Sequence, residues 1–219
     1  KKADLSDWRK VNRLEKASNK KITVSMVGKY TELADAYMSL NEALRHGGLQ
    51  NKVDVNIKYI DSENLKSNSQ LKGSDAILIP GGFGHRGING MIMATKYARE
   101  KKIPFFGICL GMQVAVIEFA RNVLKLKANS TEFDKKTNHP IIALMHEWKD
   151  SEGSIQKRNA SSDMGGTMRL GAQKCILSNK SKLKKMYKKS AIFERHRHRF
   201  EFNGNYENII TENGMKIVG

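Results

Sequence analysis

The stretch that decides the fold is residues 103–113, IPFFGICLGMQ, in which a short apolar segment leads directly into a helix-forming segment with one cysteine at the junction. Glycines stand two residues before and two residues after Cys109, and they relieve the crowding of a sharp turn from a strand into a helix. Such a turn presents its corner side chain at the end of a sheet, and the N-terminus of the helix favours a thiolate. We therefore predict that Cys109 is a nucleophile, with a cysteine that only packs between layers as the alternative.

The composition limits the class of protein. The chain has 219 residues, enough for one sizeable α/β core, and only two cysteines, which fits a reducing, cytoplasmic setting. No run of about 20 apolar residues suggests a membrane span. The formal charge of +17 could attract nucleic acid, but the basic residues are spread along the chain and no nucleic-acid motif accompanies them. We expect no nucleic-acid partner and no membrane association.

The order of apolar segments predicts the fold class. Strand-like runs occupy residues 22–28, 53–59 and 76–79, and helix-like segments follow the first at 34–44, closed by Gly47-Gly48, and the third at 91–99. Strands that alternate with helices predict an α/β fold with a doubly wound, mostly parallel sheet and helices on both faces. Active sites of such folds gather at the carboxyl ends of the strands.

A glycine-rich loop, residues 80–87, follows the third predicted strand and should reach the same edge of the sheet as Cys109. The Gly81-Gly82 pair allows backbone N–H groups to approach a ligand closely, so it is a candidate oxyanion hole together with the N–H of Leu110. A tight turn without a binding role is the alternative. The loop lacks the spacing of a phosphate-binding loop.

The C-terminal part contains a second group of candidate residues, 194–202, in which charged residues alternate as in a strand. An arginine row on one face could hold a carboxylate. The histidines lack partners at metal-site spacing, so we expect no metal. Polar residues 149–163 predict a loop, and residues 215–218 a last strand. The predicted arginine face carries Arg195, Arg197 and Arg199, and the opposite face carries His196 and His198.

Taken together, these motifs resemble the glutaminase domains of CTP synthases, which are class I (triad-type) glutamine amidotransferases. The similarity covers nearly the whole chain. The similar segments are GKY at 28–30, DAY at 35–37, PGGFG at 80–84, GICLGMQ at 107–113, NSTEF at 129–133, GGTMRLG at 165–171 and ERHRHR at 194–199. The elbow at 107–113 is shared by class I amidotransferases in general, and the last three segments are what single out the CTP synthases.

The resemblance implies an activity. Cys109 would attack the side-chain amide of L-glutamine, releasing ammonia and leaving a γ-glutamyl thioester that water hydrolyses. The ammonia would pass to an N-terminal synthase domain, a ligase of pyrimidine nucleotide biosynthesis that makes CTP from UTP with ATP and Mg. The glutaminase domain itself would need no cofactor, GTP would act as an allosteric activator, and the full-length protein would form a homotetramer.

The resemblance also implies roles for individual residues. Gly82 and Leu110 would form the oxyanion hole, and Arg86 would belong to a lid that responds to GTP. The predicted glutamine-binding residues are Gly82, Leu110, Gly111, Met112, Gln113, Glu132 and Arg199.

One departure from the family concerns the triad. The family's His and Glu partners come from a His-Pro-Glu segment, and no His-x-Glu occurs in these 219 residues. We therefore expect residues 1–20 to be a linker from a synthase domain and residues 21–219 to be a C-terminally truncated amidotransferase domain with weak activity by itself. A catalytically inactive glutamine-binding module and another class I amidotransferase are the alternatives.

Overall fold

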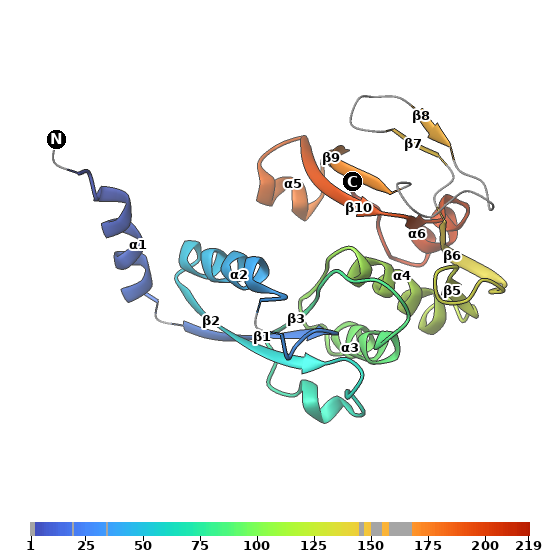
Figure 1. The fold of residues 1–219 in the computed structure, drawn as a ribbon, viewed down its shortest axis with the longest axis horizontal. Coiled ribbons are helices and arrows are strands. Elements are labelled where there is room, and N and C mark those ends of the chain that lie inside the picture. Colours follow the sequence, from blue (N-terminus) through green and yellow to red (C-terminus); the bar gives the residue numbers. More distant parts are fainter. Residues whose placement is uncertain (1–2, 19, 34, 145–146, 150–154, 158–167) are drawn as a thin grey trace. The chain divides into compact units, whose positions relative to one another are not determined.

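The computed structural model describes residues 3–18, 20–33, 35–144, 147–149, 155–157 and 168–219 (Figure 1). Contacts divide the chain into two compact units, Lys1–Ala115 and Val116–Gly219. Helix α4 (Leu110–Asn122) contains residues of both units.

The first unit is built on four parallel strands in the order β2-β1-β3-β4, drawn from blue to green in Figure 1. Their bounds are β1 (Lys20–Gly28), β2 (Val53–Asp61), β3 (Ala76–Ile79) and β4 (Phe105–Gly107). The second half of β1 and most of β3 are fully buried, since each of these strands has a neighbour on both sides. All four carboxyl ends therefore meet at one edge.

Helices cover this sheet in the doubly wound manner that the sequence predicts. Helix α2 (Met38–Gln50) packs against β2, and α3 (Ile88–Lys101) packs against β3. The strand order reverses its direction between β1 and β3. Because crossover connections are right-handed, the helices after β1 and β3 lie on opposite faces of the sheet.

The core of this unit follows from strand alternation. Val24 and Met26 project from the same face of β1 and pack with Leu78 of β3 and with Tyr37, which precedes α2. Two shorter elements complete the unit. Helix α1 (Ser6–Lys16) leaves Trp8 71% exposed, and η1 (Asn68–Leu71) connects β2 to β3.

The bounds of two predicted helices are wrong. The helix predicted from residue 34 begins at Met38, and residues 35–37 before it form a turn. Gly47-Gly48 does not close the second helix, which continues to Gln50. A Cβ on Gly48 would lie 2.6 Å from the carbonyl oxygen of Val53, so this glycine allows α2 to approach β2 closely. The helix predicted at 91–99 is longer and begins at Ile88, directly after Gly87, whose φ is 69°.

The second unit contains three small sheets. A three-stranded sheet has the order β11-β6-β5, and β9-β10 and β7-β8 are antiparallel pairs. The strands are β5 (Ala128–Ser130), β6 (His139–Leu144), β7 (Glu147–Lys149), β8 (Ile155–Lys157), β9 (Arg169–Ile176), β10 (Ala191–His198) and β11 (Phe200–Phe202). The helices are α5 (Lys182–Tyr187), η2 (Gly204–Tyr206) and α6 (Glu207–Glu212).

Two further predictions in this unit need correction. The loop predicted at 149–163 contains the last residue of β7 and all of β8, which pair with each other, and the rest of that stretch lies outside the described residues. The strand predicted at 215–218 is irregular, although Val218 accepts a backbone hydrogen bond from Ser178 (2.8 Å).

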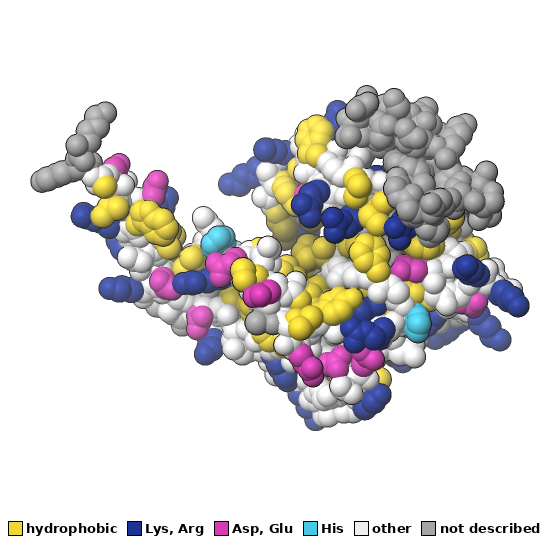
Figure 2. All heavy atoms as spheres, in the orientation of Figure 1, with side chains coloured by type: hydrophobic (Ala, Val, Ile, Leu, Met, Phe, Trp, Pro, Cys, Tyr) yellow, Lys and Arg dark blue, Asp and Glu magenta, His cyan; other side chains and the backbone are white. Residues whose placement is uncertain are grey.

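Two surface properties can be stated for the described part of the chain. None of its helices is both long enough and apolar enough to cross a bilayer. Figure 2 shows Lys and Arg side chains dispersed over the visible face, and hydrophobic side chains standing on the surface of α1.

Candidate active site

Cys109 occupies the corner between β4 and α4. Its backbone is in the left-handed region, with φ of 54°, which costs a non-glycine residue about 1–3 kcal/mol. Its carbonyl accepts the first helical hydrogen bond, from the N–H of Gln113 (3.2 Å). The thiol is partly exposed and forms no disulfide. The sharp strand-to-helix corner predicted from the sequence is therefore present, with the cysteine at its apex, and the structure adds that its backbone is strained.

The two flanking glycines are required by close contacts. A Cβ on Gly107 would lie 2.5 Å from the carbonyl oxygen of Gly111 and 2.6 Å from the backbone nitrogen of Met112. A Cβ on Gly111 would collide with the carbonyl oxygen of Ile79, the last residue of β3. The corner is thus packed backbone against backbone, and no larger residue fits at either glycine without a shift.

The glycine-rich loop lies beside this corner. A Cβ on Gly81 would lie 3.5 Å from the Cβ of Cys109 and 4.0 Å from its Sγ. A Cβ on Gly82 would lie 3.3 Å from the side chain of Leu110 and 3.9 Å from the stem of Lys29. The structure therefore brings the loop and the cysteine together, as the sequence predicts, and a main chain without side chains faces the thiol.

The topology explains why this position is suited to a ligand. Gly28, Ile79 and Gly107 end β1, β3 and β4, and the strand order reverses its direction between β1 and β3. A reversal of this kind leaves a crevice outside the carboxyl ends of the two central strands. The loops after β1 and β3 flank that crevice.

The loop after β1 contains a buried lysine to which sequence analysis gave no role. Lys29 is 6% exposed, and its Nζ donates hydrogen bonds to the carbonyl oxygens of Phe83 (2.7 Å) and Gly84 (2.5 Å). The backbone of the same loop is held by Tyr37, whose hydroxyl oxygen accepts from the N–H groups of Lys29 (3.2 Å) and Tyr30 (3.3 Å). Burial raises the pKa of Tyr37, so its hydroxyl stays protonated. The sequence shows only that a lysine directly follows an apolar run of strand length, which does not indicate these contacts.

Arg86 lies on the outer side of the same loops. It pairs with Glu63, donates through Nη2 to the carbonyl oxygen of Lys29 (3.1 Å) and stacks over the ring of Tyr30, 5.3 Å from its centroid. The hydrogen bond that Arg86 donates to the carboxylate of Glu63 raises the pKa of Arg86. This guanidinium therefore fastens the glycine-rich loop to the loop after β1.

The other predicted residues near the corner lie on α4. Leu110 and Gln113 are buried, with 1% and 4% of their surfaces exposed, whereas Met112 is 40% exposed. The backbone N–H groups of the first helical turn have no intrahelical acceptor. The N–H of Gly111 has an acceptor outside the helix, the carbonyl oxygen of Ile108 (2.9 Å), and is therefore not available to a ligand.

Within the second unit, Glu132 and Arg199 lie at one edge of the three-stranded sheet. Glu132 follows the carboxyl end of β5, which is parallel to β6, and Arg199 precedes β11, which is antiparallel to β6. Strands on either side of a common neighbour are about 10 Å apart. The sheet therefore holds a carboxylate and a guanidinium at the same end, separated by one strand.

Arg199 differs from the other arginines of its segment. The predicted row of three arginines on one strand face is wrong at this position, because β10 ends at His198, leaving Arg195 and Arg197 exposed and Arg199 partly buried. Its Nε is buried and has no hydrogen-bond partner among the described residues. A buried donor without an acceptor is rare in folded proteins and suits a group that binds an anion.

The two histidines of β10 are partly buried. Burial lowers the pKa of His198, and the nearby His196 and Arg169 lower it further. The pKa of His196 is also lowered, by burial first and then by Arg169. Among the described residues, no three His, Cys, Asp or Glu side chains come together as a metal site would require.

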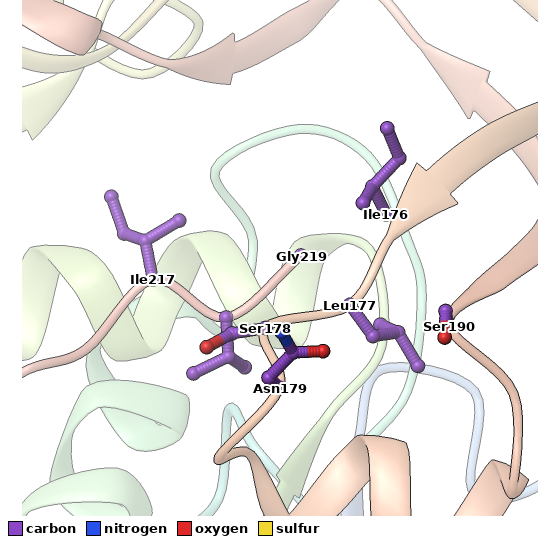
Figure 3. A pocket seen from close by; sticks show the side chains of 8 residues that line it. Ile176, Leu177, Ser178, Asn179, Ser190, Ile217 and Gly219 are labelled. Atoms are coloured by element: carbon purple, nitrogen blue, oxygen red, sulfur yellow. The ribbon is translucent and has the colours of Figure 1, made fainter.

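A surface hollow of about 450 Å³ lies elsewhere in the second unit (Figure 3). Figure 3 shows Ile176 and Leu177, at the end of β9, on one side of the view and Ile217 on the other, with Gly219 between them. None of the eight residues that line it is a predicted site residue or has a charged side chain.

Of the predicted family segments, residues 165–167 lie outside the described residues.

Comparison with known proteins assigns the family. A family model for class I glutamine amidotransferases matches residues 32–219. The chain therefore belongs to the class I glutamine amidotransferases. It is also similar to a solved structure, the Trypanosoma brucei CTPS glutaminase domain with bound acivicin. The identity is 38% and the TM-score 0.78, over 90% of this chain and 74% of that chain. The resemblance to glutaminase domains of CTP synthases is thus confirmed.

Proposed function

We propose that this chain hydrolyses L-glutamine through Cys109 and supplies the ammonia for ATP-dependent amination of UTP to CTP. The observation that carries the proposal is the left-handed backbone of Cys109, held at a strand-to-helix corner with the glycine-rich loop packed against its side chain. The likeness to a glutaminase domain that binds acivicin, a glutamine analogue, supports glutamine as the substrate.

The chemistry takes two stages. The Cys109 thiolate adds to the carbon of the glutamine amide, and the C=O electron pair moves onto oxygen, where the N–H groups of Gly82 and Leu110 stabilise it. The amide nitrogen takes up the proton that the Cys109 thiol gave to the general base, and collapse of this tetrahedral adduct then breaks the C–N bond, expels ammonia and leaves a γ-glutamyl thioester. Water then adds to the thioester, and glutamate leaves with regeneration of the thiol.

Two charged groups hold the amino-acid end of glutamine in this proposal. Arg199 binds the α-carboxylate, because its buried Nε needs an acceptor and a guanidinium matches a carboxylate in geometry. Glu132 binds the α-ammonium. Gly111, Met112 and Gln113 line the pocket from the first turn of α4.

The rest of the activity depends on groups outside these 219 residues. The general base and its carboxylate partner belong to the family's His-Pro-Glu segment. ATP and Mg bind to an N-terminal synthase domain of the same protein, a ligase of pyrimidine nucleotide biosynthesis that forms homotetramers in the cytoplasm. The glutaminase step itself uses no cofactor.

GTP acts at the lid in this proposal. Arg86 is already part of the structure that joins the glycine-rich loop to Lys29. A nucleotide that engages this guanidinium would therefore reach the loop beside Cys109 through the main chain.

The experiment uses the full-length protein that carries this chain. Release of glutamate and ammonia from glutamine is measured with and without UTP, ATP and Mg, and CTP is measured in the same mixture. A diazo-ketone analogue of glutamine is then added, and the labelled residue is located by peptide mass spectrometry. We expect glutamate release, CTP formation and labelling of Cys109, all abolished by Cys109→Ser.

Three outcomes would contradict the proposal in different ways. Labelling at Cys175 would overturn Cys109 as nucleophile. Binding of glutamine without glutamate release would favour an inactive binding module. Glutamate release with ammonia transferred to an acceptor other than UTP would favour another class I amidotransferase.

A further inference from the structure

We propose that Lys29 is a positioning residue that holds the glycine-rich loop in the conformation needed for the oxyanion hole. The inference rests on the proposed glutaminase activity. Lys29 lies in the loop after β1 and would act on the reaction without touching the reacting atoms.

The contacts of Lys29 reach the loop from two sides. Its stem passes close to the position that a Cβ of Gly82 would occupy, and its ammonium holds the next two carbonyl oxygens, those of Phe83 and Gly84. Its own carbonyl oxygen accepts a hydrogen bond from Arg86, near the other end of the loop. Lys29 therefore holds residues 83 and 84 through its side chain and residue 86 through its backbone, and its stem lies beside Gly82.

The burial of this ammonium indicates a specific role. Removing a charged amine from water costs free energy that hydrogen bonds to neutral carbonyl groups only partly offset. A methionine of similar length would fill the same space without that cost. The hydrogen bonds to Phe83 and Gly84 give this lysine a specific task, because glycine adopts many backbone conformations and a glycine-rich loop therefore needs an external constraint.

The loop that Lys29 holds lies beside the thiol of Cys109, so its conformation affects the proposed catalysis. Gly81 lies against the thiol of Cys109, and Gly82 lies between Leu110 and Lys29. If residues 83 and 84 are released, the N–H of Gly82 is free to turn away from the position of the developing oxyanion. A displacement of about 1 Å in such a group reduces turnover by about 10²-fold.

The test compares Lys29→Met with Lys58→Met in the full-length protein. Lys58 is a matched control, since its Nζ also donates to a backbone carbonyl, that of Gln70 (2.7 Å), away from the site. Three quantities are measured: kcat and KM for glutamate release, inhibition by an aldehyde analogue of glutamine, and the rate of Cys109 alkylation by iodoacetamide. The aldehyde forms a tetrahedral adduct whose oxygen needs the oxyanion hole, whereas iodoacetamide forms none.

We expect Lys29→Met to lower kcat about 100-fold, to weaken aldehyde inhibition by a similar factor, and to change KM and the alkylation rate less than about twofold. Lys58→Met should change none of these quantities. If Lys29→Met does not fold, Lys29→Gln replaces it under the same criterion.

Two results would overturn the role of Lys29 while the proposed function stands. One is a variant as active as an active wild type. The other is a loss of kcat accompanied by an equal loss of alkylation rate, which indicates general damage to the site. A wild-type protein that releases no glutamate overturns the proposed function, and this inference with it.

Discussion

Replacing Gly107 by alanine tests the packing at the corner that presents Cys109. The new Cβ would lie 2.5 Å from the carbonyl oxygen of Gly111 and 2.6 Å from the nitrogen of Met112. Neither neighbour can rotate away, because both are backbone atoms at the start of α4. To reach an ordinary contact of 3.4 Å with the nearer of these two atoms, the strand and the helix must separate by about 0.9 Å.

This separation has two expected effects. Overpacking of this kind lowers the free energy of unfolding by about 1–3 kcal/mol. The same displacement moves Leu110 and Cys109 away from the end of β3, and a misplacement of about 1 Å lowers turnover by about 10²-fold.

The control is Gly47→Ala on α2, where a new Cβ meets nothing within 4 Å. Alanine is favoured over glycine within a helix, so the free energy of unfolding of this variant should rise by about 0.5–1 kcal/mol. Urea denaturation gives the unfolding free energies, and glutamate release by the full-length protein gives turnover. Wild-type stability and turnover in Gly107→Ala would refute the packing argument.

The remaining predictions concern reactivity, hydrogen bonding and pH. Cys109→Ser should abolish glutamate release and labelling by the diazo-ketone analogue, whereas Cys175→Ser should retain both within about twofold. Tyr37→Phe removes the acceptor of two backbone N–H groups, those of the buried Lys29 and of the exposed Tyr30, and should lower the free energy of unfolding by about 1–3 kcal/mol in urea denaturation. The pKa of His198 is lowered in the folded state, so His198 is protonated more readily in the unfolded chain. The free energy of unfolding should therefore decrease as the pH falls below about 6.5. In urea denaturation at pH 7.5 and 5.5, His198→Gln should make the difference between the two free energies of unfolding smaller. An equal reduction by His46→Gln, at an exposed position of α2, would contradict this assignment.

The fold was predictable where local pattern and tertiary structure agree. The apolar runs that become β1 and β3 are buried in the middle of the sheet, so the hydrophobic pattern alone located them. The bounds of α2 were not predictable, because Gly47-Gly48 has the composition of a helix end. Gly48 serves instead for the approach of β2, a long-range contact that no local pattern reveals.

The candidate site divides in the same way. The glycine spacing around Cys109 predicted a sharp corner between a strand and a helix, since that geometry depends on residues close in sequence. Arg199 was assigned to a strand face, whereas its partial burial depends on where β10 ends. The role of Lys29 depends on carbonyl groups more than 50 residues away, and alternation of apolar and polar residues carries no information about such contacts.

The backbone of Cys109 has a consequence for how this protein varies. A residue with φ of 54° is held at a conformational cost that glycine would not incur. A Cys109→Gly substitution would therefore be expected to fold at least as well as the parent while losing its thiol. Inherited changes at this codon would escape the cell's removal of misfolded chains, so under the proposed function only selection for turnover would keep a cysteine there.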